Sequence, residues 1–216
     1  MNGEGPLTDR LEVVAAADSV LYRCLAEGFG LPDGARLERL ERMLPAVRLA
    51  CDEIAESLPV AARRPDLAAL ARALTAAQAG STEDLQADYT HLFLAGYPTT
   101  PCRLVESVHL EGTLVGEASE TAAASYLRFG LEAKEREPDN LTSELEFLAY
   151  LTGTPVEPAA ELERYREAQR TFLHEHLLRW GPALVIKIRN ATTNQLYLAL
   201  AELLDWVLSA DAARSR

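Results

Sequence analysis

Leucine recurs at steps of three and four residues through most of this chain, and no stretch of useful length alternates apolar with polar residues. Steps of three and four place side chains on one face of an α-helix, whereas strict alternation is typical of a β-strand. The clearest case lies in residues 137–152, where Leu141, Leu145, Leu148 and Leu151 form one apolar stripe. The pattern predicts an all-α fold, a single-domain bundle of about eight to ten helices.

The loop before this leucine-rich helix combines acidic residues with a proline. Pro138 is tolerated just before a first helical turn, and Asp139 or Asn140 can cap the N–H groups that follow. Glu144 is expected to lie off the leucine stripe. One interpretation is an ordinary capped core helix. The other is that Glu137, Asp139 and Asn140 face a groove and receive a partner.

The helices fall into three consecutive segments of the chain. Residues 1–80 carry N-terminal helices, residues 81–152 carry the most distinctive motifs, and residues 159–209 carry C-terminal helices. Residues 95–116 are expected to form a loop of about 20 residues, which is long for a compact domain. Loops of this length usually carry function.

Glycine and proline interrupt the C-terminal helical pattern. Residues 162–180 outline a long helix that Gly181 and Pro182 are expected to stop. The short apolar run 183–188 fits either a strand or a helix. The dense helical context favours a helix.

The net charge of −12 restricts the kind of partner that the chain can attract. A strongly acidic surface repels phosphates, which argues against nucleic acid. The charge suits a basic partner, but it could equally serve solubility. Composition alone leaves both explanations open.

The three cysteines show no pattern of a disulfide or zinc site. Cys24, Cys51 and Cys102 are far apart and form no C-x-x-C pair. Cys24 and Cys51 fall within apolar helical patterns and are interpreted as small core residues. The N-terminal ten residues lack the regions of a signal peptide, and no run of ~18 apolar residues exists. We expect a soluble, cytoplasmic protein free of disulfides.

The common enzyme signatures are missing from the sequence. It contains no G-x-G-x-x-G, no phosphate-binding glycine loop with its lysine and no G-x-S-x-G turn. A di-iron bundle would need Glu-x-x-His pairs. The residue three positions after Glu144 is Phe147, and the residue three positions after Glu146 is Ala149, so the pairs are missing. His176 stands in an apolar stripe and is interpreted as a hydrogen-bonded core residue. We therefore expect no catalysis, no cofactor and no metal.

Three stretches in order resemble the TorD/DmsD/NarJ family, the dedicated maturation chaperones of molybdenum-containing oxidoreductases. They are YTHLFLAG at 89–96, PCRLVESVH at 101–109 and EPDNLTSELEFLAYL at 137–151. The stretch FLHEHLLRWGPAL at 172–184 is also similar to the closing segment of that family. The second stretch looks closest to the delta chaperones of respiratory enzymes related to dimethyl-sulfoxide reductase. The likeness runs from residue 81 to the last helix.

The resemblance implies an all-helical cytoplasmic chaperone, monomeric or homodimeric, with no turnover of its own. It would bind the twin-arginine leader or N-terminal segment of a molybdoenzyme catalytic subunit until the molybdenum cofactor is in place. Tyr89, Leu92 and Phe93 would line the apolar part of the leader groove. Pro101, Ser107 and the turn at Asp139 would form its polar rim. The resemblance also assigns Glu106, His109, Glu137 and Asn140 to leader binding.

Two departures from the family pattern bear on the expected site. Asn140 stands where the family often has histidine, and Val105 and His109 stand where aromatic residues are common. Two other functions stay open from the residues alone. One is a helical metal-dependent enzyme or metal carrier that uses Glu137, Asp139 and His109; the other is an acidic regulatory adaptor. Neither nucleic-acid binding nor membrane insertion is expected.

Overall fold

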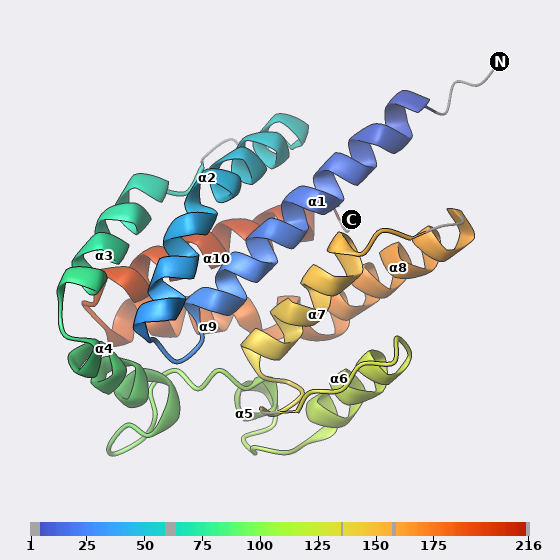
Figure 1. The fold of residues 1–216 in the computed structure, drawn as a ribbon. Coiled ribbons are helices and arrows are strands. Elements are labelled where there is room, and N and C mark those ends of the chain that lie inside the picture. The colour runs from blue at the N-terminus through green and yellow to red at the C-terminus, as the bar shows by residue number, and fades with distance from the viewer. Residues whose placement is uncertain (1–4, 59–63, 135, 157–158, 215–216) are drawn as a thin grey trace.

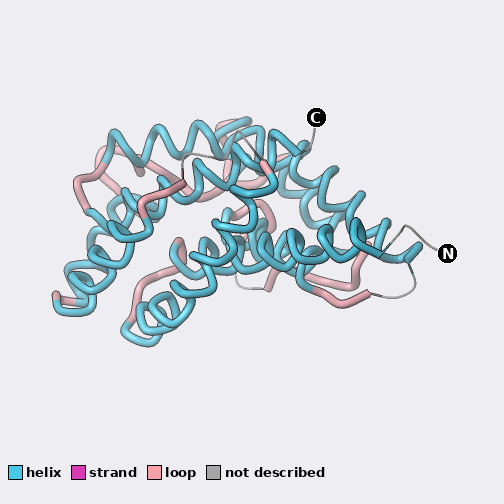
Figure 2. The backbone as a smooth tube through the Cα atoms, turned by 90° about the horizontal axis from the view of Figure 1, so that it is seen from above, coloured by secondary structure: helices cyan, strands magenta, loops and turns pink. Residues whose placement is uncertain are grey.

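The computed structural model describes residues 5–58, 64–134, 136–156 and 159–214. Helices account for nearly all regular structure in these ranges, which confirms the all-α prediction (Figure 1; Figure 2). The elements are α1 (Gly5–Gly28), α2 (Gly34–Ser57), α3 (Leu67–Ala79), α4 (Thr82–Tyr89), the π-helix η2 (Thr90–Leu94), α5 (Glu106–Leu110), α6 (Glu117–Leu127), α7 (Leu141–Gly153), α8 (Ala159–Phe172), the π-helix η3 (Leu173–Leu177), α9 (Leu178–Ala191) and α10 (Gln195–Arg214).

Helix α1 lies at the centre of the bundle. It packs along α2 on one side and α7 on the other, and it also contacts α10 (Figure 1). Helix α10 packs in turn against α9 and α3. The short helices α4, α5 and α6 lie together at one end of the molecule (Figure 1). No helix within the described residues is long and apolar enough to cross a membrane.

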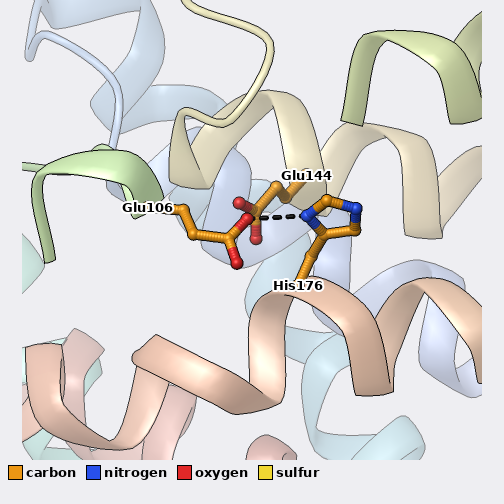
Figure 3. Close-up of side chains that lie close together, drawn as sticks. All are labelled: Glu106, Glu144 and His176. Atoms are coloured by element: carbon orange, nitrogen blue, oxygen red, sulfur yellow. Dashed lines mark hydrogen bonds and ion pairs between the residues drawn. The ribbon is translucent and has the colours of Figure 1, made fainter. Parts of the chain in front are cut away.

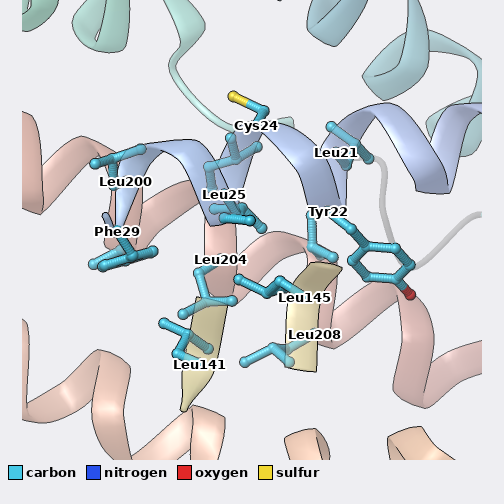
Figure 4. Packing of buried hydrophobic residues seen from close by; sticks show 14 of the residues in the cluster. Leu21, Tyr22, Cys24, Leu25, Phe29, Leu141, Leu145, Leu200, Leu204 and Leu208 are labelled. Carbon is cyan, nitrogen blue, oxygen red and sulfur yellow. The ribbon is translucent and has the colours of Figure 1, made fainter. Parts of the chain in front are cut away.

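Leucines from three distant parts of the chain form the centre of the core (Figure 4). Leu25 of α1, Leu141 and Leu145 of α7, and Leu200 and Leu204 of α10 are all fully buried. Burial of a leucine side chain contributes about 1.5–3 kcal/mol to folding. The predicted stripe of α7 is therefore confirmed as a core-facing surface.

The predicted helix stop at Gly181 and Pro182 is wrong. Helix α8 passes through η3 into α9, and Pro182 lies inside α9. Pro182 is exposed, whereas Trp180 and Ile188 on the same helix are fully buried. Burial of this apolar face outweighs the backbone hydrogen bond that proline forfeits. The run 183–188 is confirmed as helix.

Residues 95–116 are not the unbroken loop that the sequence predicted, because α5 forms within them. Glu111 follows α5, and its carboxylate accepts hydrogen bonds from the backbone N–H groups of Glu117 and Ala118, each at 2.9 Å. A carboxylate at a helix N-terminus satisfies free N–H groups and complements the helix dipole. The connection between α5 and α6 is therefore tied down.

The three cysteines are free and fully buried, as the core interpretation of Cys24 and Cys51 predicted. Burial raises the pKa of the Cys24 and Cys51 thiols to about 12 and that of Cys102 to about 11. These side chains act as small apolar groups.

A buried ion cluster joins the first helix to the last. Arg214 of α10 donates to Asp18 of α1 at 2.7 Å and to Asp211 at 2.6 Å. The hydroxyl of Tyr22 also donates to Asp211, at 2.9 Å. Burial raises the pKa of Asp18 to about 7, although the Arg214 charge opposes the shift. The cluster explains how an acidic residue is accommodated on the apolar face of α1.

We predict that Asp18→Asn flattens the dependence of stability on pH. The Asp18 pKa rises from an unfolded value of 3.8 to about 7 on folding. The folded state therefore holds this proton more tightly, and the contribution of Asp18 to stability is lost as pH rises from 4 to 7. Urea unfolding between pH 4 and pH 8 measures the slope. Asp205→Asn, at an exposed pair with Arg189, is the control and should keep the wild-type slope. An unchanged slope in Asp18→Asn would contradict the assignment.

Candidate functional site

The two central motifs meet through backbone hydrogen bonds. Val105 and Asn140 form an isolated antiparallel bridge. The Glu106 N–H donates to the Asp139 carbonyl at 2.9 Å, and the Leu141 N–H donates to the Leu104 carbonyl at 2.8 Å. The segment before α5 is therefore fixed to the turn that opens α7.

Asp139 and Asn140 perform different tasks in this turn. Asn140 is the N-cap of α7, and its side-chain oxygen accepts from the Thr142 N–H at 3.1 Å and the Thr142 hydroxyl at 2.8 Å. Asp139 is fully buried, and its carboxylate accepts from the Ser107 N–H at 2.8 Å. Of the two caps that the sequence allowed, the structure uses Asn140, while Asp139 anchors the first turn of α5.

Ser107 was expected on the polar rim and Glu106 was assigned to leader binding, but the structure buries both completely. A carboxylate oxygen of Glu106 lies 2.6 Å from Nδ1 of His176 in η3 (Figure 3). This contact confirms His176 as a hydrogen-bonded core residue. Phe172 stacks on the His176 ring with their centroids 4.5 Å apart, which fixes the orientation of the imidazole.

Glu144 is also fully buried, beside Glu106, so the expectation that it lies off the leucine stripe is wrong. Its carboxylate accepts from the Trp180 indole N–H at 3.2 Å. Burial raises the pKa of Glu144 well above its usual range, and the neighbouring Glu106 carboxylate raises it further. Glu144 therefore favours its protonated form more than an exposed glutamate does.

The expected apolar lining residues Tyr89, Leu92 and Phe93 are buried in the core. The Tyr89 and Phe93 rings lie 5.1 Å apart, and Phe93 meets Tyr197 edge-on at 5.2 Å. The Tyr89 hydroxyl donates to the Phe29 carbonyl at 3.0 Å. In this conformation these side chains stabilise the junction of α1, α4, η2 and α10, and a leader would contact them only after helices separate.

Pro101, His109 and Glu137 are half-buried and reach the surface. Nε2 of His109 lies 2.7 Å from the Arg103 carbonyl, and its Nδ1 lies 3.2 Å from Nζ of Lys187. Burial lowers the pKa of His109, so its imidazole is neutral at pH 7. Among the described residues, Glu137, Asp139 and His109 do not form a group within metal-ligating range.

A hollow of about 470 Å³ lies beside the turn that opens α7. It is lined by α7 on one side and by residues 131–134 and Arg136 on the other. Its volume is in the range typical of small-ligand and side-chain pockets. The apolar residues Leu131, Ala133, Phe147 and Tyr150 contribute to its lining. The charged residues of its lining are Glu132, Lys134, Arg136 and Glu146.

A family model described as the nitrate reductase delta subunit matches residues 47–185, which is more than half of the chain. The chain belongs to the nitrate reductase delta subunit family. This membership confirms the resemblance to the TorD/DmsD/NarJ chaperones.

Curated relatives of this family member are named as chaperones. The chain is 31% identical over 138 residues to the perchlorate reductase assembly chaperone protein of Dechloromonas aromatica, a match covering 60% of this chain and 61% of the relative. It is 29% identical over 125 residues to the chaperone protein TorD of Vibrio cholerae, covering 56% and 57% respectively. The matches thus span about three fifths of each relative's length.

A solved structure from Archaeoglobus fulgidus, described as that of a redox enzyme maturation protein, has the same fold. It superposes with a TM-score of 0.58 at 21% identity and covers 84% of this chain and 88% of that chain. The similarity at this level of identity concerns the fold alone.

In this delta-subunit family member, sequence reasoning missed the buried cluster of Glu106, Glu144 and His176, and the hollow beside α7. A signal for Glu144 was present, because Leu141, Glu144 and Leu148 are spaced by three and four residues. That spacing places Glu144 on the buried stripe. The hollow depends on how residues 131–134 and Arg136 lie against α7, which periodicity does not encode.

We predict that Asp139→Ala destabilises the fold more than Asn140→Ala. Loss of the Asp139 carboxylate leaves the buried Ser107 N–H without its acceptor, at a cost of about 1.5–3 kcal/mol. Loss of an N-cap usually costs about 1 kcal/mol. Urea unfolding gives the ranking. Asp139→Asn retains an acceptor oxygen, so it should lose less unfolding free energy than Asp139→Ala does. Equal losses for the two alanine variants would refute the anchoring role of Asp139.

Proposed function

We propose that this chain is a dedicated cytoplasmic chaperone for a molybdenum-containing oxidoreductase. It binds the twin-arginine leader or N-terminal segment of the catalytic subunit, assists assembly and cofactor insertion before export, and catalyses no reaction itself. The observation that carries this proposal is family membership together with two curated relatives named as chaperones, one for perchlorate reductase.

The hollow beside α7 is the best candidate for the leader-docking site. It lies next to Glu137, a residue that the resemblance assigns to leader binding, because the lining residue Arg136 directly precedes Glu137 in the chain. The Ser143 hydroxyl donates to the Glu137 carbonyl at 3.2 Å, which joins the wall of the hollow to the turn. Leader binding there requires no separation of the core helices.

Apolar burial should set the affinity of this site. The lining carries two carboxylates, Glu132 and Glu146, and two cations, Lys134 and Arg136, so its own charges balance. An exposed ion pair contributes only about 0–1 kcal/mol, whereas a buried leucine-sized side chain contributes about 1.5–3 kcal/mol. A leader pairs basic residues with an apolar run. The overall charge of −12 would speed its approach, and the hollow would hold its apolar part.

The buried residues Tyr89, Leu92, Phe93, Glu106, Ser107 and Asp139 would act indirectly in this scheme. Asp139 and Ser107 fix the turn beside the hollow through their hydrogen bond. The aromatic cluster supports the end of the bundle that carries α4 and η2. Direct contact with a leader is proposed for Pro101, His109, Glu137 and Asn140, which reach the surface.

We predict that Ala133→Trp, which fills the hollow, weakens leader binding at least about tenfold, or 1.4 kcal/mol. Calorimetric titration of the folded protein with twin-arginine leader peptides measures the effect. Ala71→Trp is the matched control, because it fills a different hollow of about 420 Å³ lined by α2 and α3. The control should bind as the wild type does.

The two possible failures have separate meanings. Wild-type protein that binds no leader or N-terminal peptide from any molybdoenzyme would refute the proposed function. If Ala133→Trp binds the leader with wild-type affinity, the docking site lies outside the hollow. Circular dichroism of each variant confirms that the fold is intact before titration.

A further inference from the structure

Three separate segments bring acidic and imidazole side chains to one point inside the bundle. Glu106 comes from the start of α5, Glu144 from α7 and His176 from η3 (Figure 3). One potential ligand atom from each lies within 4.8 Å of the other two. Glu106 and Glu144 are 0% exposed and His176 is 1% exposed. A π-helical turn, such as the one that carries His176, often marks a functional site.

Several polar atoms of this cluster lack a hydrogen-bond partner among the described residues. They are one carboxylate oxygen on each of Glu106 and Glu144 and Nε2 of His176. Within the cluster Glu106 bonds to His176, the Trp180 indole N–H donates to Glu144, and the Glu106 and Glu144 carboxyl groups interact with each other. Buried polar groups are nearly always paired, so free oxygens on two adjacent buried carboxylates indicate a missing partner.

The balance of charge points the same way. Elsewhere in the core the chain buries Asp18 and Asp211, and it places the Arg214 guanidinium against both. Among the described residues, no lysine or arginine forms an ion pair with Glu106 or Glu144. Asp139, also buried, adds a third carboxylate beside the start of α7. Buried carboxylates require a proton, a cationic partner or a metal ion.

We propose that Glu106, Glu144 and His176 form a binding site for one divalent transition-metal ion of the zinc type. One imidazole nitrogen with two carboxylates is a donor set that suits Zn²⁺, and helical bundles build metal sites from such inward-facing residues. Mg²⁺ fits less well, because it prefers oxygen ligands and retains its water. This site differs in place and chemistry from the proposed leader-docking hollow.

Small movements would complete the coordination geometry. Ligand atoms on a tetrahedral zinc ion lie about 3.4 Å apart, given metal–ligand bonds of about 2.0–2.2 Å. Nδ1 of His176 and the Glu106 oxygen, now 2.6 Å apart, would separate slightly, and the proton between them would be released. A free carboxylate oxygen or a water molecule would take the fourth position. The bound ion would lock α5, α7 and η3 together.

Zinc titration of the full chain tests the site. Wild-type protein, stripped with a chelator and then titrated with Zn²⁺ against a chromophoric competitor, should bind one ion per chain and should ignore Mg²⁺. Glu144→Gln keeps the shape of the side chain but removes a charged ligand, and it should weaken zinc binding at least about a hundredfold. Asp211→Asn removes a buried carboxylate from the arginine-paired cluster and should bind zinc as the wild type does.

X-ray absorption of the zinc-loaded wild type gives an independent readout that needs no variant to fold. The expected first shell contains oxygen and a single imidazole nitrogen at about 2.0–2.1 Å. A sulfur shell would assign the ion to cysteine and would overturn the proposal. So would a folded wild type that binds no zinc, or a folded Glu144→Gln that binds zinc with wild-type affinity.

Discussion

The pairing of residues 104–106 with the turn at 139–141 determines how the motif-bearing half of this protein is arranged. Two backbone hydrogen bonds and the Asp139 carboxylate attach α5 to the start of α7. Because α7 packs along α1, this attachment holds α5 against the bundle, where it also contacts α9. Glu106 then reaches His176, which lies 70 residues away in the chain. The hollow beside α7 likewise depends on the same turn.

Periodicity predicted the helices well because a helix buries a face, and a face is visible in local spacing. The stripe on α7 and the helical nature of 183–188 were predictable for this reason. The continuation of the helix through Gly181 and Pro182 was not, because distant partners bury Trp180 and Ile188 and override local propensity. The motif residues could be named from the sequence, but their exposure could not. Spacing does not show whether Phe93 or Asp139 meets solvent or another helix.

The core handles buried charge in two ways. At Asp18 and Asp211, one arginine forms ion pairs with both carboxylates and joins the first helix to the last. At Glu106 and Glu144, a single imidazole faces two carboxylates, with an indole N–H as the other donor. In the first cluster a guanidinium bonds to both carboxylates, whereas in the second one oxygen on each carboxylate has no donor among the described residues. Unequal neutralisation of this kind separates a structural ion cluster from a site with unfilled binding capacity.

The burial of all three cysteines limits how readily this protein reacts with the thiols of other proteins. At a thiol pKa of about 12, roughly one molecule in 10⁵ carries the reactive thiolate at neutral pH. Under the proposed chaperone function, a client subunit with exposed thiols would meet no reactive thiolate on these three cysteines. The packing of α1, α2 and the segment after η2 therefore keeps Cys24, Cys51 and Cys102 unreactive toward other sulfur groups.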